Sequence, residues 1–285
     1  MINMIRNIKL RHICVRHGSE RKDSRLVSFF LCDDCFNLLR VKALNNYQPA
    51  YIMPENGYIK GYCLYCGKYT NVRQYFYFLC EICERIIHSY GKELAARNFI
   101  LSWWNEVRQR YNLDDIELKV EDPVVPMSYI EHRRYKKQSK PKPDFVAVKG
   151  NQPLFVIEMK TGRGSINEMS RFQLDISDCD DILGFLQQPQ YHAPTFLFHV
   201  QVLEDYKPPT IKYVGVNAWW ASLYELEKNV MEVKMRPRER RLAVYYRKNV
   251  FRPIIEFPNY ILSGGLEHEK ELLNQRLPKL YPEQK

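Results

Sequence analysis

The amino-acid sequence predicts an α/β protein in which a central mixed sheet, flanked by helices, follows a small cysteine-rich module. Two observations favour this fold class. Seven of the eight cysteines lie within the first 90 residues, six of them in three C-x2-C pairs and the seventh in Cys14-x2-His17. Beyond them, apolar patterns typical of helices alternate with patterns typical of strands. We therefore divide the 285 residues into a module at 1–90 and a larger domain at 91–285.

The composition is that of an ordinary globular protein, with 45% hydrophobic and 27% charged residues. The net charge of +10 and the pI of about 9.1 predict a polyanionic partner, because Lys and Arg displace counterions from phosphate backbones. No run of about 18 apolar residues is present. We expect a soluble, cytoplasmic protein with no membrane partner, and a homodimer is an alternative to a monomer.

The cysteine-rich module contains an internal repeat of 48 to 49 residues. Each copy holds two pairs of metal-ligand residues, and two such pairs suit the four tetrahedral ligands of Zn²⁺. We therefore predict two structural zinc sites, taken in sequence order. The first would use Cys14, His17, Cys32 and Cys35, and the second would use Cys63, Cys66, Cys80 and Cys83.

The module resembles zinc-ribbon or treble-clef modules, because the second cysteine pair of each copy leads into an amphipathic stretch, at 36–41 and 84–90. Such modules often bind nucleic acid; the alternative is that the metals only stabilise a segment too small for its own core. Disulfide bonds are the other interpretation of paired cysteines. Cys179 lies outside the repeat and is expected to be a buried structural thiol.

A long helix is predicted at residues 91–111, where Ala96, Ile100, Val107 and Tyr111 follow one face at helical spacing. A β-hairpin is predicted at residues 143–160, where two apolar runs flank a turn that contains Gly150.

If the turn of this hairpin centres on Asn151, antiparallel pairing places Asp144 opposite Glu158. Glu158 and Lys160 are two residues apart and share one face of their strand, while Met159 points to the other. Two close carboxylates repel each other unless a divalent cation such as Mg²⁺ lies between them. Such an ion would polarise a phosphate and activate a water, and Lys160 would neutralise the charge that develops. An incidental salt bridge on a surface hairpin is the alternative, but both apolar runs predict a buried sheet.

Further elements continue the alternation. We predict a helix capped by Ser177 or Asp178 and ending near 187, strands at 195–203, 211–216 and 241–246, and a helix at 219–228.

The hairpin resembles the signature of the PD-(D/E)XK (restriction-endonuclease-like) nuclease superfamily, as Pro143-Asp144, thirteen residues, then Glu158-Met159-Lys160. The resemblance covers about residues 91–216 and implies a restriction-endonuclease-like core. It also implies that Asp144, Glu158 and the Met159 carbonyl bind Mg²⁺ and that Lys160 is the catalytic lysine.

Members of this superfamily often carry a metal-assisting Glu on the first helix of the core. Glu93 resembles that residue best and Glu106 is its rival, although both would ordinarily be solvated carboxylates on a helix surface. Some members also carry a Gln-x3-Tyr helix after the lysine. Gln187 and Tyr191 have this spacing, but Pro189 between them argues against a helix.

A basic run directly precedes Asp144, and we expect it to contact the phosphate backbone of DNA. Its cations are Arg133, Arg134, Lys136, Lys137, Lys140 and Lys142. A second basic cluster occupies 234–241, and a solvated loop is the alternative for either run.

The sequence therefore predicts a Mg²⁺-dependent DNA endonuclease, such as a type II restriction enzyme or a phage or mobile-element nuclease. A DNA repair or junction-resolving nuclease is one alternative. The other is a non-catalytic, zinc-containing protein that binds nucleic acid.

Overall fold

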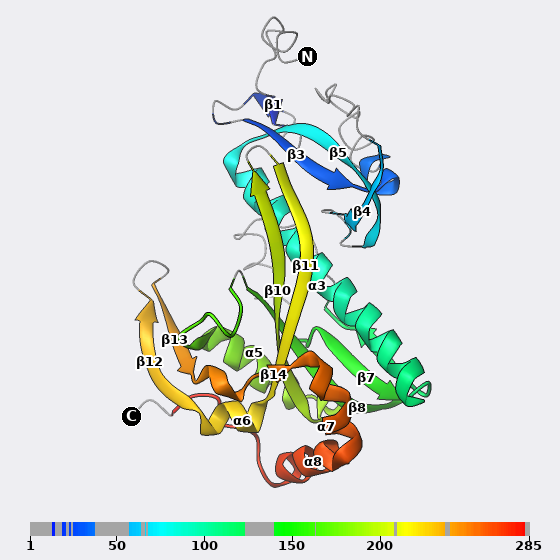
Figure 1. Ribbon diagram of the computed structural model, residues 1–285. Coiled ribbons are helices and arrows are strands. Elements are labelled where there is room, and N and C mark those ends of the chain that lie inside the picture. Colours follow the sequence, from blue (N-terminus) through cyan, green and yellow to red (C-terminus); the bar gives the residue numbers. More distant parts are fainter. Residues whose placement is uncertain are drawn as a thin grey trace, which may run out of the picture. The chain divides into compact units, whose positions relative to one another are not determined.

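The computed structural model describes residues 13–14, 19–20, 23, 25–37, 57–63, 66, 68–122, 140–162, 164–207, 210–236 and 240–282. The chain forms two compact units. Unit 1 contains 1–99, 124–128 and 202–215, and unit 2 contains 100–123, 129–201 and 216–285. These ranges differ from a division at residue 90. The boundary falls inside helix α3 (Glu81–Tyr111), and strands β10 (Thr195–Lys207) and β11 (Thr210–Ser222) contribute to both units (Figure 1).

The sheet of unit 1 is built around β5 (Tyr69–Leu79), which pairs antiparallel with β3 (Arg25–Leu31) on one side and with β4 (Ile59–Tyr62) on the other. Strands β3 and β4 therefore run in the same direction and finish at the same end of the sheet. The beginning of β11 adds to the other edge of β3 in parallel. A short hairpin of β1 (Ile13–Cys14) and β2 (Ser19–Glu20) precedes β3.

Helix α3 ends at Tyr111, as predicted, but begins at Glu81, ten residues before the predicted start. It therefore includes the amphipathic stretch 84–90 that we had assigned to the cysteine-rich module. The reason is local: the amide N–H of Glu84 donates to the carbonyl of Cys80, and the carboxylate of Asp23 accepts from the amide N–H of Glu81. The cysteine turn thus becomes the capped first turn of the helix.

Unit 2 contains a mixed sheet in the order β11, β10, β8, β7, β6. Strand β8 (Gln152–Gly162) pairs in parallel with β10 and antiparallel with β7 (Phe145–Lys149), which pairs antiparallel with β6 (Ile116–Val120). The predicted central mixed sheet flanked by helices is therefore confirmed. No helix among the described residues is long and apolar enough to cross a membrane.

Strands β7 and β8 confirm the predicted hairpin, and a bulge gives it the predicted register. Lys149 lies opposite Gln152 across a turn in which Gly150 adopts a positive φ of 62°. A register shift at Ala147 and Val148 then places Phe145 opposite Ile157. Asp144, just before β7, therefore lies at the level of Glu158, although the turn itself is centred half a residue from Asn151.

Helices cover both faces of this sheet. Helix α5 (Ile176–Leu186) packs its buried residues, including Ile182 and Phe185, into the core that contains Val156 and Leu197. On the other face Phe155 contacts the rings of Trp104 in α3 and Phe257 in α7 (Phe257–Tyr260). Burying such rings stabilises each by roughly 2 to 3 kcal/mol, which fixes the sheet that carries the charged residues.

A second sheet of unit 2 contains β12 (Val230–Arg236), β13 (Arg241–Tyr246) and β9 (Phe172–Asp175). The predicted helix at 219–228 is wrong in its first half, because Trp219 and Trp220 belong to β11. Helix α6 (Leu223–Lys228) begins after Ser222, which forms a capping box with Glu225. Among the described residues, unit 2 also contains β14 (Arg252–Pro253) and α8 (Leu266–Gln275), with short helical turns at Pro189–Tyr191, Lys248–Val250, Ile254–Glu256 and Ile261–Gly265.

Candidate active site and candidate metal centre

Asp144 is held at the start of β7 by two backbone amides. Its carbonyl oxygen accepts from the N–H of Glu121 at 3.1 Å, and its Oδ2 accepts from the N–H of Met159 at 2.7 Å. The residue is buried, with 9% of its surface exposed. Because the paired strands fix the direction of the Met159 amide, they also fix the carboxylate beside the strand that carries Glu158.

The support extends to Glu121, whose carboxylate accepts from the hydroxyl of Tyr191 at 2.8 Å. Tyr191 ends the 3₁₀ turn that contains Pro189, so the absence of an α-helix that we expected there is confirmed for this segment. Tyr191 is buried and binds the side chain of Glu121, and the amide of Glu121 in turn binds the carbonyl of Asp144.

Glu158, Lys160 and Asp178 form a charged cluster beside Asp144. The Nζ atom of Lys160 donates to Oε1 of Glu158 at 2.8 Å and lies 3.4 Å from Oδ1 of Asp178. Glu158 and Lys160 are two residues apart on β8, and Asp178 comes from the first turn of α5. Lys160 therefore lies between carboxylates from the sheet and from the helix that covers it.

Negative charge exceeds positive charge in this cluster. Burial raises the pKa of Glu158 to about 7; Lys160 opposes this rise, whereas Asp144 and Asp178 add to it. Burial alone would lower the pKa of Lys160, but the carboxylates of Glu158, Asp178 and Asp144 together raise it above its ordinary value. Lys160 is therefore protonated at neutral pH and supplies positive charge or a proton, rather than a base.

The donor set fits a hard divalent cation. Asp144 and Glu158 offer carboxylate oxygens, which are the ligands that Mg²⁺ prefers. Burial raises the pKa of Glu158, and the carboxylates of Asp144 and Asp178 raise it further, so three carboxylates surround the one ammonium of Lys160. A bound cation would remove that imbalance. The contribution of the Met159 carbonyl stays a prediction.

Asp178 was not selected from the sequence as a site residue, because we had treated it as a helix cap. The helix begins after Asp175, whose carboxylate instead pairs with Arg236 and Arg241 at 3.0 and 3.1 Å. Asp178 is consequently the third residue of α5, where it reaches Lys160. One feature of the sequence could have identified Asp178: it is an acidic residue in the first turn of a helix that follows the hairpin.

Glu93 and Glu106 lie on α3 in different units. Glu93 belongs to unit 1, where Oε1 lies 3.5 Å from Nη2 of Arg97, and Glu106 is exposed in unit 2. The assisting role predicted for Glu93 stays a prediction.

Of the basic run that precedes Asp144, the structure describes Lys140 and Lys142, and both are exposed. Between them, the carbonyl of Pro141 accepts from Nε2 of Gln188 at 2.7 Å, which ties the run to the end of α5. The other cations of the run lie outside the described residues; they are Arg133, Arg134, Lys136 and Lys137.

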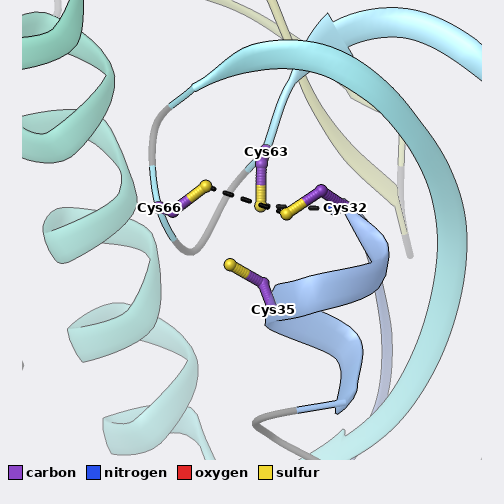
Figure 2. Close-up of side chains that lie close together, drawn as sticks. All are labelled: Cys32, Cys35, Cys63 and Cys66. Atoms are coloured by element: carbon purple, nitrogen blue, oxygen red, sulfur yellow. Dashed lines mark hydrogen bonds between the residues drawn. The ribbon is translucent and has the colours of Figure 1, made fainter.

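Four cysteines of unit 1 gather at one end of its sheet, with their side chains directed toward a common point (Figure 2). Their sulfur atoms all lie within 4.8 Å of one another, and those of Cys32 and Cys66 are 3.8 Å apart. A tetrahedral zinc with Zn–S bonds of about 2.3 Å separates its sulfurs by about 3.8 Å. The four-cysteine cluster, which could bind a metal such as zinc, consists of Cys32, Cys35, Cys63 and Cys66.

The sheet brings these cysteines together. Cys32 directly follows β3 and Cys63 directly follows β4, the two strands that finish at the same end of β5. Cys35 lies in the helical turn at 33–37. Cys66 is held through its carbonyl, which accepts from Nδ2 of Asn98 at 2.6 Å.

The thiols of the cluster form hydrogen bonds with one another, and a bound cation could take the place of the protons in these bonds. Hydrogen bonds from Cys35 and Cys66 lower the pKa of Cys63 to about 2, whereas the bond to Cys63 raises the pKa of Cys35 far above its ordinary value. One thiolate is thus stabilised by protons on its neighbours. A Zn²⁺ ion would stabilise several thiolates at once, so the donor set fits it.

This cluster corrects the predicted grouping of the ligands. It combines the second pair of the first copy with the first pair of the second copy, so these ligand pairs do not group in sequence order. The repeat order misled because sheet pairing, rather than sequence order, decides which pairs meet. His17 lies outside the described residues, and Cys14 is described only as the backbone of β1.

Comparison with known proteins assigns no family. No protein-family model matches the chain, and no curated protein matches it. The inference of function therefore depends on the charged cluster and the four-cysteine cluster.

Proposed function

We propose that this protein is a metal-dependent DNA nuclease that hydrolyses phosphodiester bonds. The observation that supports this best is the pair of buried carboxylates, Asp144 and Glu158, with the half-buried ammonium of Lys160 beside them at the end of one hairpin. Burying two carboxylates so close together is costly unless their charges have a chemical function. The matching PD-(D/E)XK signature and the central mixed sheet favour a restriction-endonuclease-like core.

In this proposal Asp144 and Glu158 would hold a Mg²⁺ ion, which would polarise the scissile phosphate and acidify an attacking water. The amide of Met159 orients Asp144. Lys160, protonated and 2.8 Å from Glu158, turns its ammonium toward the phosphate and stabilises the charge that develops there. Oδ1 of Asp178 lies 3.4 Å from that ammonium, and it positions Lys160 when no DNA is bound.

DNA is the proposed substrate because the chain is strongly basic and its basic run leads straight into Asp144. The four-cysteine cluster is proposed to hold a structural zinc. The alternative is a nuclease that recognises the shape of DNA, as in repair, and it would use the same core chemistry. Mapping the cleaved ends distinguishes such a nuclease from a sequence-specific enzyme.

The decisive experiment is cleavage of long duplex DNA by the full-length protein with Mg²⁺. We expect Asp144→Ala, Glu158→Ala and Lys160→Ala each to lower the cleavage rate by at least about a hundredfold, because each removes a metal ligand or a charge partner of the transition state. DNA affinity, measured without Mg²⁺, should change little.

Glu117→Gln is the matched control, since Glu117 is an exposed carboxylate on β6, next to the hairpin. It should cleave like the wild type. Cleavage close to wild type by all three variants, or none by the wild type on duplex, single-stranded or branched DNA, would overturn the proposal and favour a protein that binds nucleic acid without cutting it.

A further inference from the structure

Strands β4 and β5 of unit 1 form a hairpin whose two faces differ in exposure. Tyr62 lies opposite Tyr69 across the strands, and Lys60 lies opposite Asn71. These two pairs are two residues apart and therefore share one face, whereas Val72, on the other face, is buried with 1% of its surface exposed. The shared face is open to solvent, because 64% of the surface of Tyr69 is exposed and both Lys60 and Asn71 are exposed.

A further tyrosine and a further cation extend this face at the beginning of β4. The guanidinium of Arg73, two residues beyond Asn71 on β5, lies 3.8 Å from the centre of the Tyr58 ring. The hydroxyl of Tyr58 donates to the carboxylate of Asp33, and 44% of the surface of Tyr58 stays exposed. The ring is therefore held in place by two polar groups, and it in turn holds a cation on the face that carries Tyr69.

The four-cysteine cluster lies at the end of the same hairpin. Cys63 directly follows Tyr62, and its amide N–H donates to the carbonyl of Lys68, just before Tyr69, at 2.9 Å. The rings of Tyr62 and Tyr69 meet edge to face beside it, with their centres 5.0 Å apart. We call this exposed side of the hairpin the tyrosine face; it consists of Tyr58, Lys60, Tyr62, Tyr69, Asn71 and Arg73.

Exposed rings that alternate with cations fit the chemistry of an unpaired nucleic-acid strand. An unpaired base has a flat face that stacks on a tyrosine ring, and the phosphates beside it attract Lys and Arg. Tyr58 and Tyr62 are four strand residues apart, about 13 Å, so the face offers two stacking positions with the ammonium of Lys60 between them. The core of a protein–protein interface is instead depleted of charged residues, and Lys is disfavoured there. The charge of the tyrosine face therefore favours a polyanion over a protein partner.

We propose that the tyrosine face binds single-stranded DNA, with bases stacked on Tyr58 and Tyr69 and with phosphates bound by Lys60 and Arg73. The choice of DNA over RNA rests on the proposed function, whereas the stacking itself needs no cleavage. Duplex DNA fits this face less well, because its bases are already stacked on one another. The sequence of the strand would matter little, since every base has a face that can stack on a ring.

The test is the affinity of the full-length protein for a fluorescein-labelled oligothymidine of about 12 nucleotides, measured by fluorescence anisotropy without Mg²⁺. We expect Tyr69→Ala to weaken binding by about tenfold, and Tyr58→Ala with Tyr69→Ala by about a hundredfold, because each change removes a stacked base. Tyr69→Phe should bind like the wild type, since stacking needs the ring and not the hydroxyl. Lys60→Gln with Arg73→Gln should reduce the slope of log affinity against log salt by up to about 1.4.

Ile82→Ala is the control, because it removes an exposed apolar side chain of α3 from unit 1; it should bind like the wild type. Hydrogen exchange at residues 59–79 checks that each tyrosine variant keeps the hairpin folded.

Three results would overturn the proposal: wild-type affinity in the double tyrosine variant, tighter binding of a matched duplex or of oligouridine, or a dimer of the wild type that Tyr69→Ala abolishes in sedimentation. The last would assign the face to a second copy of the chain. Because the assay involves no cleavage, a protein that binds oligothymidine through Tyr69 but cuts no DNA would refute the nuclease alone. Cleavage of DNA together with wild-type affinity in the double variant would refute the tyrosine face alone.

Discussion

The charged cluster of unit 2 and the four-cysteine cluster of unit 1 both fit metal ions, but the protein builds them differently. In unit 2, Asp144 and Glu158 lie on adjacent strands of one hairpin, and the Met159 amide already holds a carboxylate in place. In unit 1, the cysteines follow β3 and β4, which are separated by β5 and joined by a long stretch of chain. Backbone pairing holds the carboxylate of Asp144 itself in the first site, whereas in the second it places only Cys32 and Cys63, and we expect a metal to hold the turns of Cys35 and Cys66 against them.

The largest expected effect follows from that contrast. Cys63→Ser should lose one zinc and unfold the end of unit 1 around β4 and the start of β5, because a structural zinc contributes an apparent free energy on the order of 10 kcal/mol. Native mass spectrometry measures the ion, and hydrogen exchange measures the loss of protection at residues 59–79.

Cys179→Ser is the control, because Cys179 is buried in unit 2 with its sulfur 3.6 Å from the hydroxyl of Tyr246, away from the cluster ligands. It should keep all zinc and leave unit 1 protected. Full protection of β4 and β5 in Cys63→Ser without a zinc at the four-cysteine cluster would mean that the sheet preorganises this site too, and the contrast between the two regions would fail.

The same contrast explains how much the sequence could predict. The hairpin site depends on a period of two along each strand and on one turn, so Asp144, Glu158 and Lys160 could be brought together from local pattern alone. Grouping the cysteines requires the neighbour relations of β3, β4 and β5, which no local pattern contains. Asp178 was missed for a related reason, since the start of α5 decides the face on which it lies.

A second error came from apolar residues that fit either type of element. Trp219 and Trp220 resemble the buried face of a helix, yet the capping box of Ser222 and Glu225 starts the helix only after them. Tertiary packing of Trp220 against Phe196 and Phe257 favours the strand.

A smaller effect tests whether holding the charged cluster in place lowers the stability of the folded protein. With its pKa raised from 4.5 to about 7, Glu158 binds a proton more readily in the folded than in the unfolded protein. Without Mg²⁺, the free energy of unfolding should therefore fall as pH rises from about 4.5 to 7, by at most roughly 3 kcal/mol. Glu158→Gln should remove this slope and be more stable than the wild type at pH 8.

Thermal unfolding of the Mg²⁺-free protein between pH 5 and 8 measures the slope, with Glu117→Gln as the exposed control. Added Mg²⁺ should stabilise the wild type more at pH 8 than at pH 5, because the ion competes with the proton on Glu158. The free energy of unfolding could instead depend on pH with the same slope in wild type and Glu158→Gln. That result would mean that water or a movement of the side chains stabilises the charge of Glu158, and that the site is not preorganised.

The smallest expected effect compares the two basic segments of the chain. The run that ends at Lys142 leads into Asp144, whereas in the cluster at 234–241 both Arg236 and Arg241 pair with Asp175. Removing two exposed cations from each gives a matched pair of variants: Lys140→Ala with Lys142→Ala, and Lys234→Ala with Arg240→Ala. Both double variants lower the net charge by two. Only the first should weaken DNA binding, by about tenfold, and reduce the slope of log affinity against log salt by up to about 1.8.

Substituting Arg133, Arg134, Lys136 and Lys137 by Ala should reduce this salt slope further. The rate at saturating DNA and any sequence preference should persist, because phosphate contacts position the protein while base contacts specify the site. Equal effects of the two double variants would indicate attraction by net charge alone, and a changed cleavage sequence would mean that the run reads bases.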